Sequence, residues 1–148
     1  LNEDEKYQRI RIRKLIVELK KNGLDKKKFF NTIKNLKYSD RVIKYYVSKN
    51  LKENTFFSAS KNQYLVNKEF FHQPYEVIFR SFSIIIQNIG KKYYPVRGKK
   101  LDNLINDIQN NMRLKVTLGG CIVKKYNDTV IIYKEIWNLL GFAKIDTC

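Results

Sequence analysis

The chain has 148 residues, of which 43% are hydrophobic, and a formal net charge of +16 from 30 Lys and Arg against 14 Asp and Glu. This length allows one domain of common size or two small units. No apolar run reaches the roughly 18 residues that cross a bilayer, and the polar start LNEDEKYQ is not a secretory signal. Cys121 and Cys148 lack metal-ligand or redox spacing. We therefore expect reduced thiols, no membrane contact and a cytoplasmic location.

The excess positive charge favours a polyanionic partner such as a nucleic acid. A compact chain with this much like charge repels itself unless the charge is neutralised. The chain is also rich in Lys, Asn, Ile and Tyr, a bias that an AT-rich genome produces without any function behind it. Some of the charge is therefore background.

The residue pattern of the N-terminal part of the chain predicts helices. A first helix is expected over residues 5–22, ended by Asn22-Gly23, because four apolar residues recur at the spacing of one helical face. These are Ile12, Leu15, Ile16 and Leu19. Asp25 should cap a second helix that either continues to about residue 50 or breaks near residues 38–40.

From residue 55 the pattern mixes strands with helices. We expect two short strands within residues 55–66, a short helical turn capped by Asn67, and a core helix that starts at Pro74 and runs to about residue 89. An amphipathic helix should follow over residues 97–111, with Met112 continuing its apolar face.

The last part of the chain predicts a bend and a hairpin. Strands are expected over residues 114–118, 122–126 and 129–133, with a backbone bend at Gly119-Gly120 and a two-residue turn at Asn127-Asp128. Residues 137–148 could pack one helical turn onto the body. The predicted fold class is α+β, mainly helical with a small antiparallel sheet or hairpin near the C-terminus. The domain boundary is expected between residues 51 and 57, which gives a helical segment 1–54 and a domain 55–148.

No self-contained catalytic site is visible. His72 is the only histidine and has no Ser or Cys on a Gly-marked elbow near it. Gly119-Gly120 is not followed by the Lys-Ser/Thr pair and helix of a phosphate loop. The sequence predicts no metal site.

Arg9, Arg11 and Arg13 mark the start of the first helix. Arg9 and Arg13 share a helix face, and Arg11 points away from both. Cations are unfavourable at a helix N-terminus, so three arginines there favour an external anion, which arginine can bind in bidentate fashion. A solvated basic face balanced by nearby carboxylates is equally consistent.

Further basic clusters favour contact with RNA. Phosphate contact next to base stacking needs cations mixed with aromatic rings, and Tyr93 and Tyr94 lie among these cations. The candidates are Lys26, Lys27, Lys28, Lys91, Lys92, Tyr93, Arg97, Lys99 and Lys100. The alternative is a solvated surface with the two tyrosines packed into the core.

Four segments in fixed order resemble one family. NEDEKYQRIRIRKLIVEL resembles the end of the catalytic domain of tRNA(Ile)-lysidine synthetases, and GLDKKKFFNTIKNL the helix that follows it in bacterial members. FRSFSIIIQNIGKKYYPVRGKKLDNLINDI and TLGGCIVKKYNDTVIIYKE are similar to the family's later helical domain and closing hairpin. The resemblance covers most of residues 2–135. It implies that residues 1–54 are the end of the catalytic domain with linker helices, and residues 55–148 a substrate-binding domain.

The resemblance implies an ATP- and Mg-dependent reaction of the full-length enzyme. The family adenylates the wobble cytidine of the tRNA(Ile) anticodon, and the substrate lysine then displaces AMP. The family's ATP loop is Ser-Gly-Gly-x-Asp-Ser, and this sequence has no Ser-Gly pair. The chain alone is therefore expected to bind no cofactor and to be inactive, while the basic clusters hold the anticodon arm.

By the same resemblance, Arg9, Arg11 and Arg13 match the arginine motif that borders the family's active site. Arg11 or Arg13 would neutralise charge on the triphosphate or the adenylated intermediate, and Arg9 would join the RNA contacts. Ile10 stands where many members have Asn, which puts the local hydrogen bonding in doubt.

Two other functions stay open. One is a stand-alone basic module that binds nucleic acid or protein without catalysis. The other is a helix-turn-helix DNA-binding unit around Gly23, which is weaker because the second helix begins with Lys and Phe in place of base-reading side chains.

Overall fold

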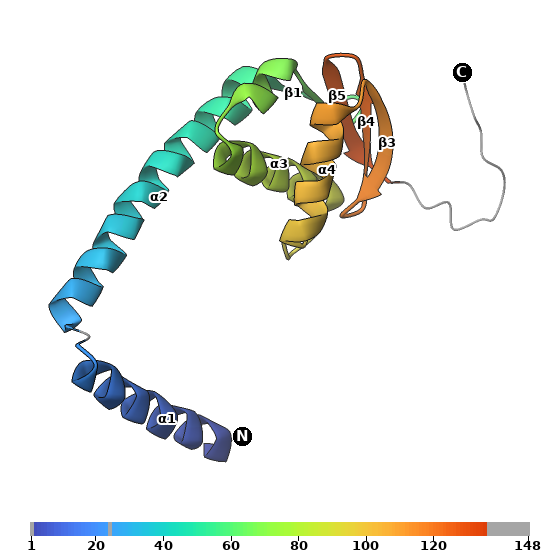
Figure 1. Cartoon of the computed structure of the whole chain (residues 1–148). Helices are drawn as coiled ribbons and strands as arrows, with labels where there is room; N and C mark the ends of the chain where they lie inside the picture. The colour runs from blue at the N-terminus through green and yellow to red at the C-terminus, as the bar shows by residue number, and fades with distance from the viewer. Residues whose placement is uncertain (1, 24, 136–148) are drawn as a thin grey trace. The chain divides into compact units, whose positions relative to one another are not determined.

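The computed structural model describes residues 2–23 and 25–135, with side chains from residue 7 onward (Figure 1). By their internal contacts the residues form two compact units, Leu1–Val42 and Ile43–Cys148. The predicted domain boundary near residue 54 stays a prediction. The helical turn expected in residues 137–148 lies outside the described residues. In the described part of the chain, no helix is long and apolar enough to span a membrane.

The first unit consists of α1 (Asn2–Lys21) and the start of α2 (Lys26–Asn54). Gly23 has φ +89°, so it provides the expected left-handed stop after α1. Asp25 accepts a hydrogen bond from the Lys27 amide at 2.9 Å, as expected of a cap. α2 does not break at residues 38–40. Ser39 Oγ instead donates to the Asn35 carbonyl at 3.1 Å, which accommodates the polar side chain within the helix.

The second unit holds the end of α2 and the remaining elements in chain order. These are β1 (Thr55–Ser58), β2 (Gln63–Val66), the 3-10 helix η1 (Lys68–His72), α3 (Tyr75–Gly90), α4 (Gly98–Asn110), β3 (Arg113–Leu118), β4 (Cys121–Tyr126) and β5 (Thr129–Lys134). Asn67 Oδ1 accepts from the Phe70 amide and caps η1, as predicted. Pro74 is the N-terminal cap of α3, so the helix begins at Tyr75, one residue after the predicted start at Pro74.

The strands form one antiparallel sheet in the order β1-β2-β5-β4-β3. β2 pairs with β5, with Val66 opposite Val130, so the early strand pair and the late hairpin join a single sheet. Figure 1 shows α3 and α4 on the same side of this sheet. The predicted α+β class with an antiparallel sheet is confirmed.

The core lies between the sheet and the two helices. α3 contributes a broad apolar surface, as its composition predicted, and α4 contributes the stripe Leu101, Leu104, Ile105 and Ile108. The sheet contributes Val66, Cys121, Val123, Val130 and Ile132. Met112 is 73% exposed, so its predicted place on the apolar face is wrong. The helix ends at Asn110, and Asn111 is already extended, so the helical spacing does not reach Met112.

Two glycines bring the end of α3 against the β3–β4 turn. Gly119 has φ +62° and Gly120 has φ +79°, as a tight hairpin turn with two left-handed residues requires. A Cβ on Gly119 would lie 2.6 Å from Ile86 Cγ2 and 2.7 Å from Val96 Cγ2, and a Cβ on Gly90 would collide with the Gly119 carbonyl. The backbone bend predicted at Gly119-Gly120 is therefore present, and it needs glycine for conformation and for space.

Cys121 lies directly after this turn and is fully buried. Its Sγ donates to the Ile86 carbonyl at 3.3 Å, which adds a hydrogen bond between β4 and α3. Burial raises the pKa of the Cys121 thiol to about 11. The thiol is thus a packed, protonated core group, consistent with the expectation of a reduced cysteine.

We predict that Gly119→Ala lowers the free energy of unfolding by about 2–4 kcal/mol, because it adds left-handed strain to overpacking. The measurement is equilibrium unfolding in urea. The matched control is Gly98→Ala at the start of α4, where the nearest atom to a new Cβ is Phe79 Cζ at 3.8 Å. That change should be neutral or stabilising by up to about 1 kcal/mol. Equal effects of the two substitutions would contradict the account of the turn.

We also predict that the stability advantage of the wild type over Cys121→Ala shrinks at alkaline pH. The thiol pKa rises from 9.0 in the unfolded chain to about 11 in the folded one, so the folded state retains its proton longer. The contribution is fully present below pH 9 and is lost as pH rises through 11. Urea unfolding of both proteins across this range tests the prediction, and a constant difference would refute it.

Candidate nucleic-acid interface

A surface pocket of about 330 Å³ lies where the α3–α4 connection meets the β3–β4 turn. We call this pocket the basic hollow. It is lined by Lys92, Tyr93, Tyr94, Val96, Arg97, Lys100, Leu118 and Gly119. The cations and tyrosines come from the connection and the first turn of α4, Leu118 comes from the end of β3, and Gly119 comes from the β3–β4 turn.

Local hydrogen bonds fix the connection. Lys91 has φ +49° and forms the left-handed cap of α3. The Lys92 amide donates to the Gln87 carbonyl at 3.3 Å, and Gln87 Nε2 donates to the Tyr93 carbonyl at 3.0 Å. Because Gln87 is bonded to both Lys92 and Tyr93, the start of the basic aromatic segment is held to the last turn of α3.

Tyr93 and Tyr94 point into solvent. They are 87% and 77% exposed, and their ring centroids lie 4.9 Å apart in an edge-to-face arrangement. The alternative that these tyrosines pack into the core is therefore wrong. Two exposed rings beside cations are the combination that stacks nucleic-acid bases while lysine and arginine contact phosphates.

The cations of the basic hollow form no close ion pair with a described carboxylate. Among the described residues, no carboxylate lies within 4.0 Å of the charged nitrogens of Lys92, Arg97 or Lys100. Asp102, the carboxylate nearest to them in sequence, accepts a hydrogen bond from the Tyr75 hydroxyl. That bond is the main reason why the pKa of Tyr75 rises to about 12. Arg97 caps α4, whose first turn carries no acid, so the positive end of the helix dipole adds to the field.

The structure gathers four of the predicted RNA-binding residues in the basic hollow: Lys92, Tyr93, Arg97 and Lys100. Lys91 and Lys99 are exposed next to them in sequence but do not line it. Tyr94, Leu118 and Gly119 were not among the predicted contacts. Tyr94 was visible as part of the basic aromatic segment, whereas contact with Leu118 and Gly119 needs the sheet.

The other predicted residues lie in the first unit. Arg9, Arg11 and Arg13 are exposed on α1, and Lys26, Lys27 and Lys28 are exposed in the first turn of α2. The suggested roles of Arg11 and Arg13 at an active-site border stay predictions, as do the RNA contacts of Arg9 and the three lysines.

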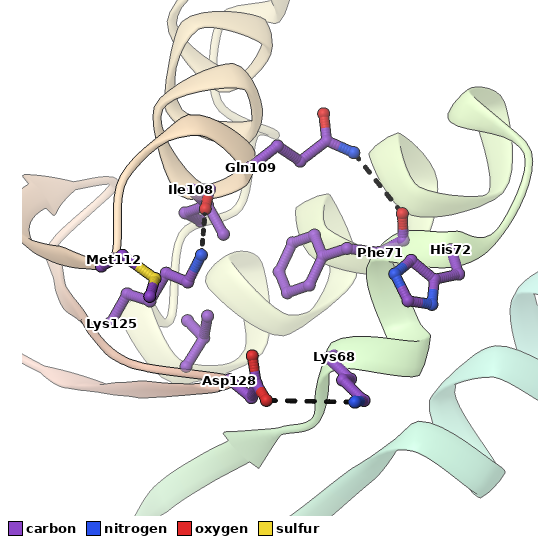
Figure 2. Close-up of a pocket in the computed structure, with 9 residues that line it drawn as sticks. Lys68, Phe71, His72, Ile108, Gln109, Met112, Lys125 and Asp128 are labelled. Atoms are coloured by element: carbon purple, nitrogen blue, oxygen red, sulfur yellow. Dashed lines mark hydrogen bonds and ion pairs between the residues drawn. The ribbon is translucent and has the colours of Figure 1, made fainter.

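A second hollow, of about 440 Å³, lies between η1, the end of α4 and the β4–β5 turn (Figure 2). Its polar groups mostly bind one another. Lys125 Nζ donates to the Ile108 carbonyl at 2.6 Å, and Lys68 Nζ lies 4.0 Å from Asp128 Oδ2. Lys125 thus satisfies the C-terminal end of α4. This hollow is a less suitable anion site than the basic hollow.

The described residues contain no acid, histidine and cysteine cluster that could hold a metal ion. His72 is exposed, and its Nδ1 lies 3.2 Å from Glu69 Oε2 on the same short helix. This arrangement is a local surface pair with no nucleophile attached. The chemistry available to the described site is therefore the binding of an anion and of aromatic rings.

Comparison with known proteins gives two relatives of the same name. The chain is 26% identical over 137 residues to a tRNA(Ile)-lysidine synthase of Wolbachia pipientis wMel, covering 90% of this chain and 31% of the relative. It is 31% identical over 68 residues to a tRNA(Ile)-lysidine synthase of Wolbachia sp. subsp. Brugia malayi (strain TRS), covering 45% of this chain and 16% of the relative. No family model and no solved structure matches the chain.

The chain spans less than a third of the length of these curated relatives. The similarity to the first of them nevertheless extends over 90% of this chain. The resemblance predicted from the sequence is thereby confirmed: the chain is similar to tRNA(Ile)-lysidine synthases, which modify tRNA.

Proposed function

We propose that this chain is the C-terminal, tRNA-contacting part of a tRNA(Ile)-lysidine synthase. In the full-length enzyme, lysine is ligated to the wobble cytidine of the tRNA(Ile) anticodon at the expense of ATP. The observation that carries the proposal is the basic hollow, which lies in a chain similar to these enzymes over 90% of its length. The partner is the anticodon arm of tRNA(Ile), and the reaction takes place in the cytoplasm.

The geometry of the basic hollow supports phosphate binding. Arg97 offers a planar group with paired donors suited to a phosphate, while Lys92 and Lys100 act as point charges on flexible stems. Tyr93 and Tyr94 would then stack against bases or riboses next to the bound phosphates.

The chemical steps would belong to residues outside this sequence. The chain has no Ser-Gly pair, and its described residues lack an acid cluster for Mg. ATP, Mg and the substrate lysine are therefore proposed to bind elsewhere in the full-length enzyme. Arg11 and Arg13 on α1 are proposed to border the nucleotide site of the full-length enzyme, with Arg9 in contact with RNA.

We predict that Lys92→Gln/Arg97→Gln/Lys100→Gln weakens tRNA(Ile) binding and flattens its salt dependence. Each lost phosphate contact reduces the slope of log affinity against log salt by roughly 0.7–0.9, so the slope should fall by about 2–3. The measurement is fluorescence anisotropy of labelled tRNA(Ile) at several salt concentrations, at constant pH.

The matched control is Lys37→Gln/Lys49→Gln/Lys61→Gln, which removes three exposed cations from other places. Both variants have the same net charge, 16 − 3 = 13. The control should retain nearly all of the wild-type affinity. Equal losses in the two variants would favour the alternative, a basic module that binds through its overall charge.

We further predict that the purified chain, given ATP, Mg, lysine and tRNA(Ile), releases no AMP. The described residues that bind RNA contain no group that activates a cytidine. Thin-layer separation of labelled adenine nucleotides measures this. Formation of AMP that depends on tRNA would contradict the assignment of the chemistry to other residues.

A further inference from the structure

The proposed function does not use one surface of the second unit, the side of the sheet away from α3 and α4. We call it the open face. Strand register places on it Phe56, Ser58, Gln63, Leu65, Arg113, Lys115, Thr117, Ile122, Lys124, Tyr126, Thr129, Ile131 and Tyr133. None of these side chains is buried, whereas the opposite side carries the buried residues of the core.

Three aromatic rings lie on the open face. Phe56 is 65% exposed and Tyr126 is 59% exposed, and Tyr133 is half-buried. Exposed rings on a sheet cost free energy in water unless something covers them at least part of the time. Tyr126 is opposite Thr129, four residues before Tyr133 on β5. The two tyrosines are thus separated by about 14 Å along the strands. At this separation the two rings cannot both stack on the same base.

Each tyrosine has a cation beside it. The Arg113 guanidinium carbon lies 5.1 Å from the Tyr126 ring centroid, and Lys124 Nζ lies 5.5 Å from that of Tyr133. Arg113 and Tyr126 are direct cross-strand partners. A cation beside a ring contacts one side of it, and Tyr126, which is 59% exposed, has ring surface open to solvent. Each pair therefore combines a surface for a base with a charge for its phosphate.

The charge of the open face has one sign. Arg113, Lys115 and Lys124 are cations, and no carboxylate lies among the residues of this face. A protein partner that covers aromatic and aliphatic side chains does not need a surface with cations alone. A polyanion with aromatic bases is complementary to a surface that has both cations and aromatic rings. Stacking on exposed aromatic side chains also needs bases outside a duplex, because paired bases are already stacked.

We infer that the open face of the sheet binds unpaired bases of a single-stranded RNA segment. Tyr126 and Tyr133 stack separate bases of the segment, and Arg113, Lys115 and Lys124 contact its phosphates. Phe56 offers a third ring at the β1 edge. The inference rests on the proposed function and deepens it: the basic hollow grips the backbone of the tRNA, while the open face holds bases of one of its loops.

The test uses the full chain and a single-stranded oligoadenylate of about ten nucleotides, within the site sizes of single sheet modules. A central 2-aminopurine reports stacking by its fluorescence. Tyr126→Leu and Tyr133→Leu should each weaken binding about fivefold or more and reduce the 2-aminopurine signal. Tyr126→Phe and Tyr133→Phe retain the ring and should bind like the wild type.

Two controls separate stacking from other effects. Tyr45→Leu removes from α2 a tyrosine that is 66% exposed, more than Tyr126 or Tyr133, and should leave binding unchanged. A duplex RNA of the same length should bind the wild type and both Leu variants equally, since its bases are not available. Urea unfolding checks that the exposed substitutions leave the fold intact, and if one Leu variant does not fold, the other Leu variant decides the question.

The outcomes distinguish the two proposals. If the Leu variants bind the oligoadenylate like the wild type while Lys92→Gln/Arg97→Gln/Lys100→Gln loses tRNA, the open-face inference is wrong and the proposed function stands. If the wild type binds neither tRNA nor oligoadenylate at low salt, the proposed function fails and the inference with it. Loss of binding in the Phe variants as well would exclude stacking as the cause.

Discussion

The close approach of Gly90 and Gly119 positions everything else in the second unit. It lets the last turn of α3 contact the β3–β4 turn, and the buried Cys121 thiol bonds to α3 directly beside it. The α3–α4 connection must then leave over this turn, which carries Lys92, Tyr93 and Arg97 to the rim of one hollow. Interiors pack at crystal density, so even one methyl group at this contact would displace a helix or a hairpin. The candidate binding site thus depends on two positions without side chains.

The sheet separates two tasks by strand alternation. Residues on one side of the sheet, such as Val123 and Ile132, build the core against α3 and α4. Their neighbours along each strand, such as Lys124 and Tyr133, form the open face. A slip of one residue in register would exchange the two sets, so the packing that stabilises the fold also fixes the basic and aromatic surface. Stability and the proposed RNA contact therefore come from the same hydrogen-bond register.

Much of the fold follows from local sequence signals. Helical periodicity predicted α3 and α4, Asn67 predicted the cap of η1, and the Gly and Asn-Asp turns predicted the late hairpin. The pairing of β2 with β5 was not predictable, because it joins residues far apart in the chain that carry no local signal for each other. Met112 was misplaced for the opposite reason, since helical spacing continued by chance beyond the end of α4. The candidate site was visible as a basic aromatic segment, but Gly119 and Leu118 joined it only through tertiary contact.

The arrangement of charge distinguishes function from composition. A genome rich in AT raises the number of lysines but does not decide where carboxylates lie. In the second unit, Glu69 is paired with His72, Glu76 with Arg80 and Asp128 with Lys68. The basic hollow and the open face contain cations without any carboxylate among their residues. If composition alone decided where lysines lie, carboxylates would lie near them on every surface. Two acid-free surfaces that both carry exposed tyrosines are therefore better explained by a polyanion with aromatic bases than by compositional bias.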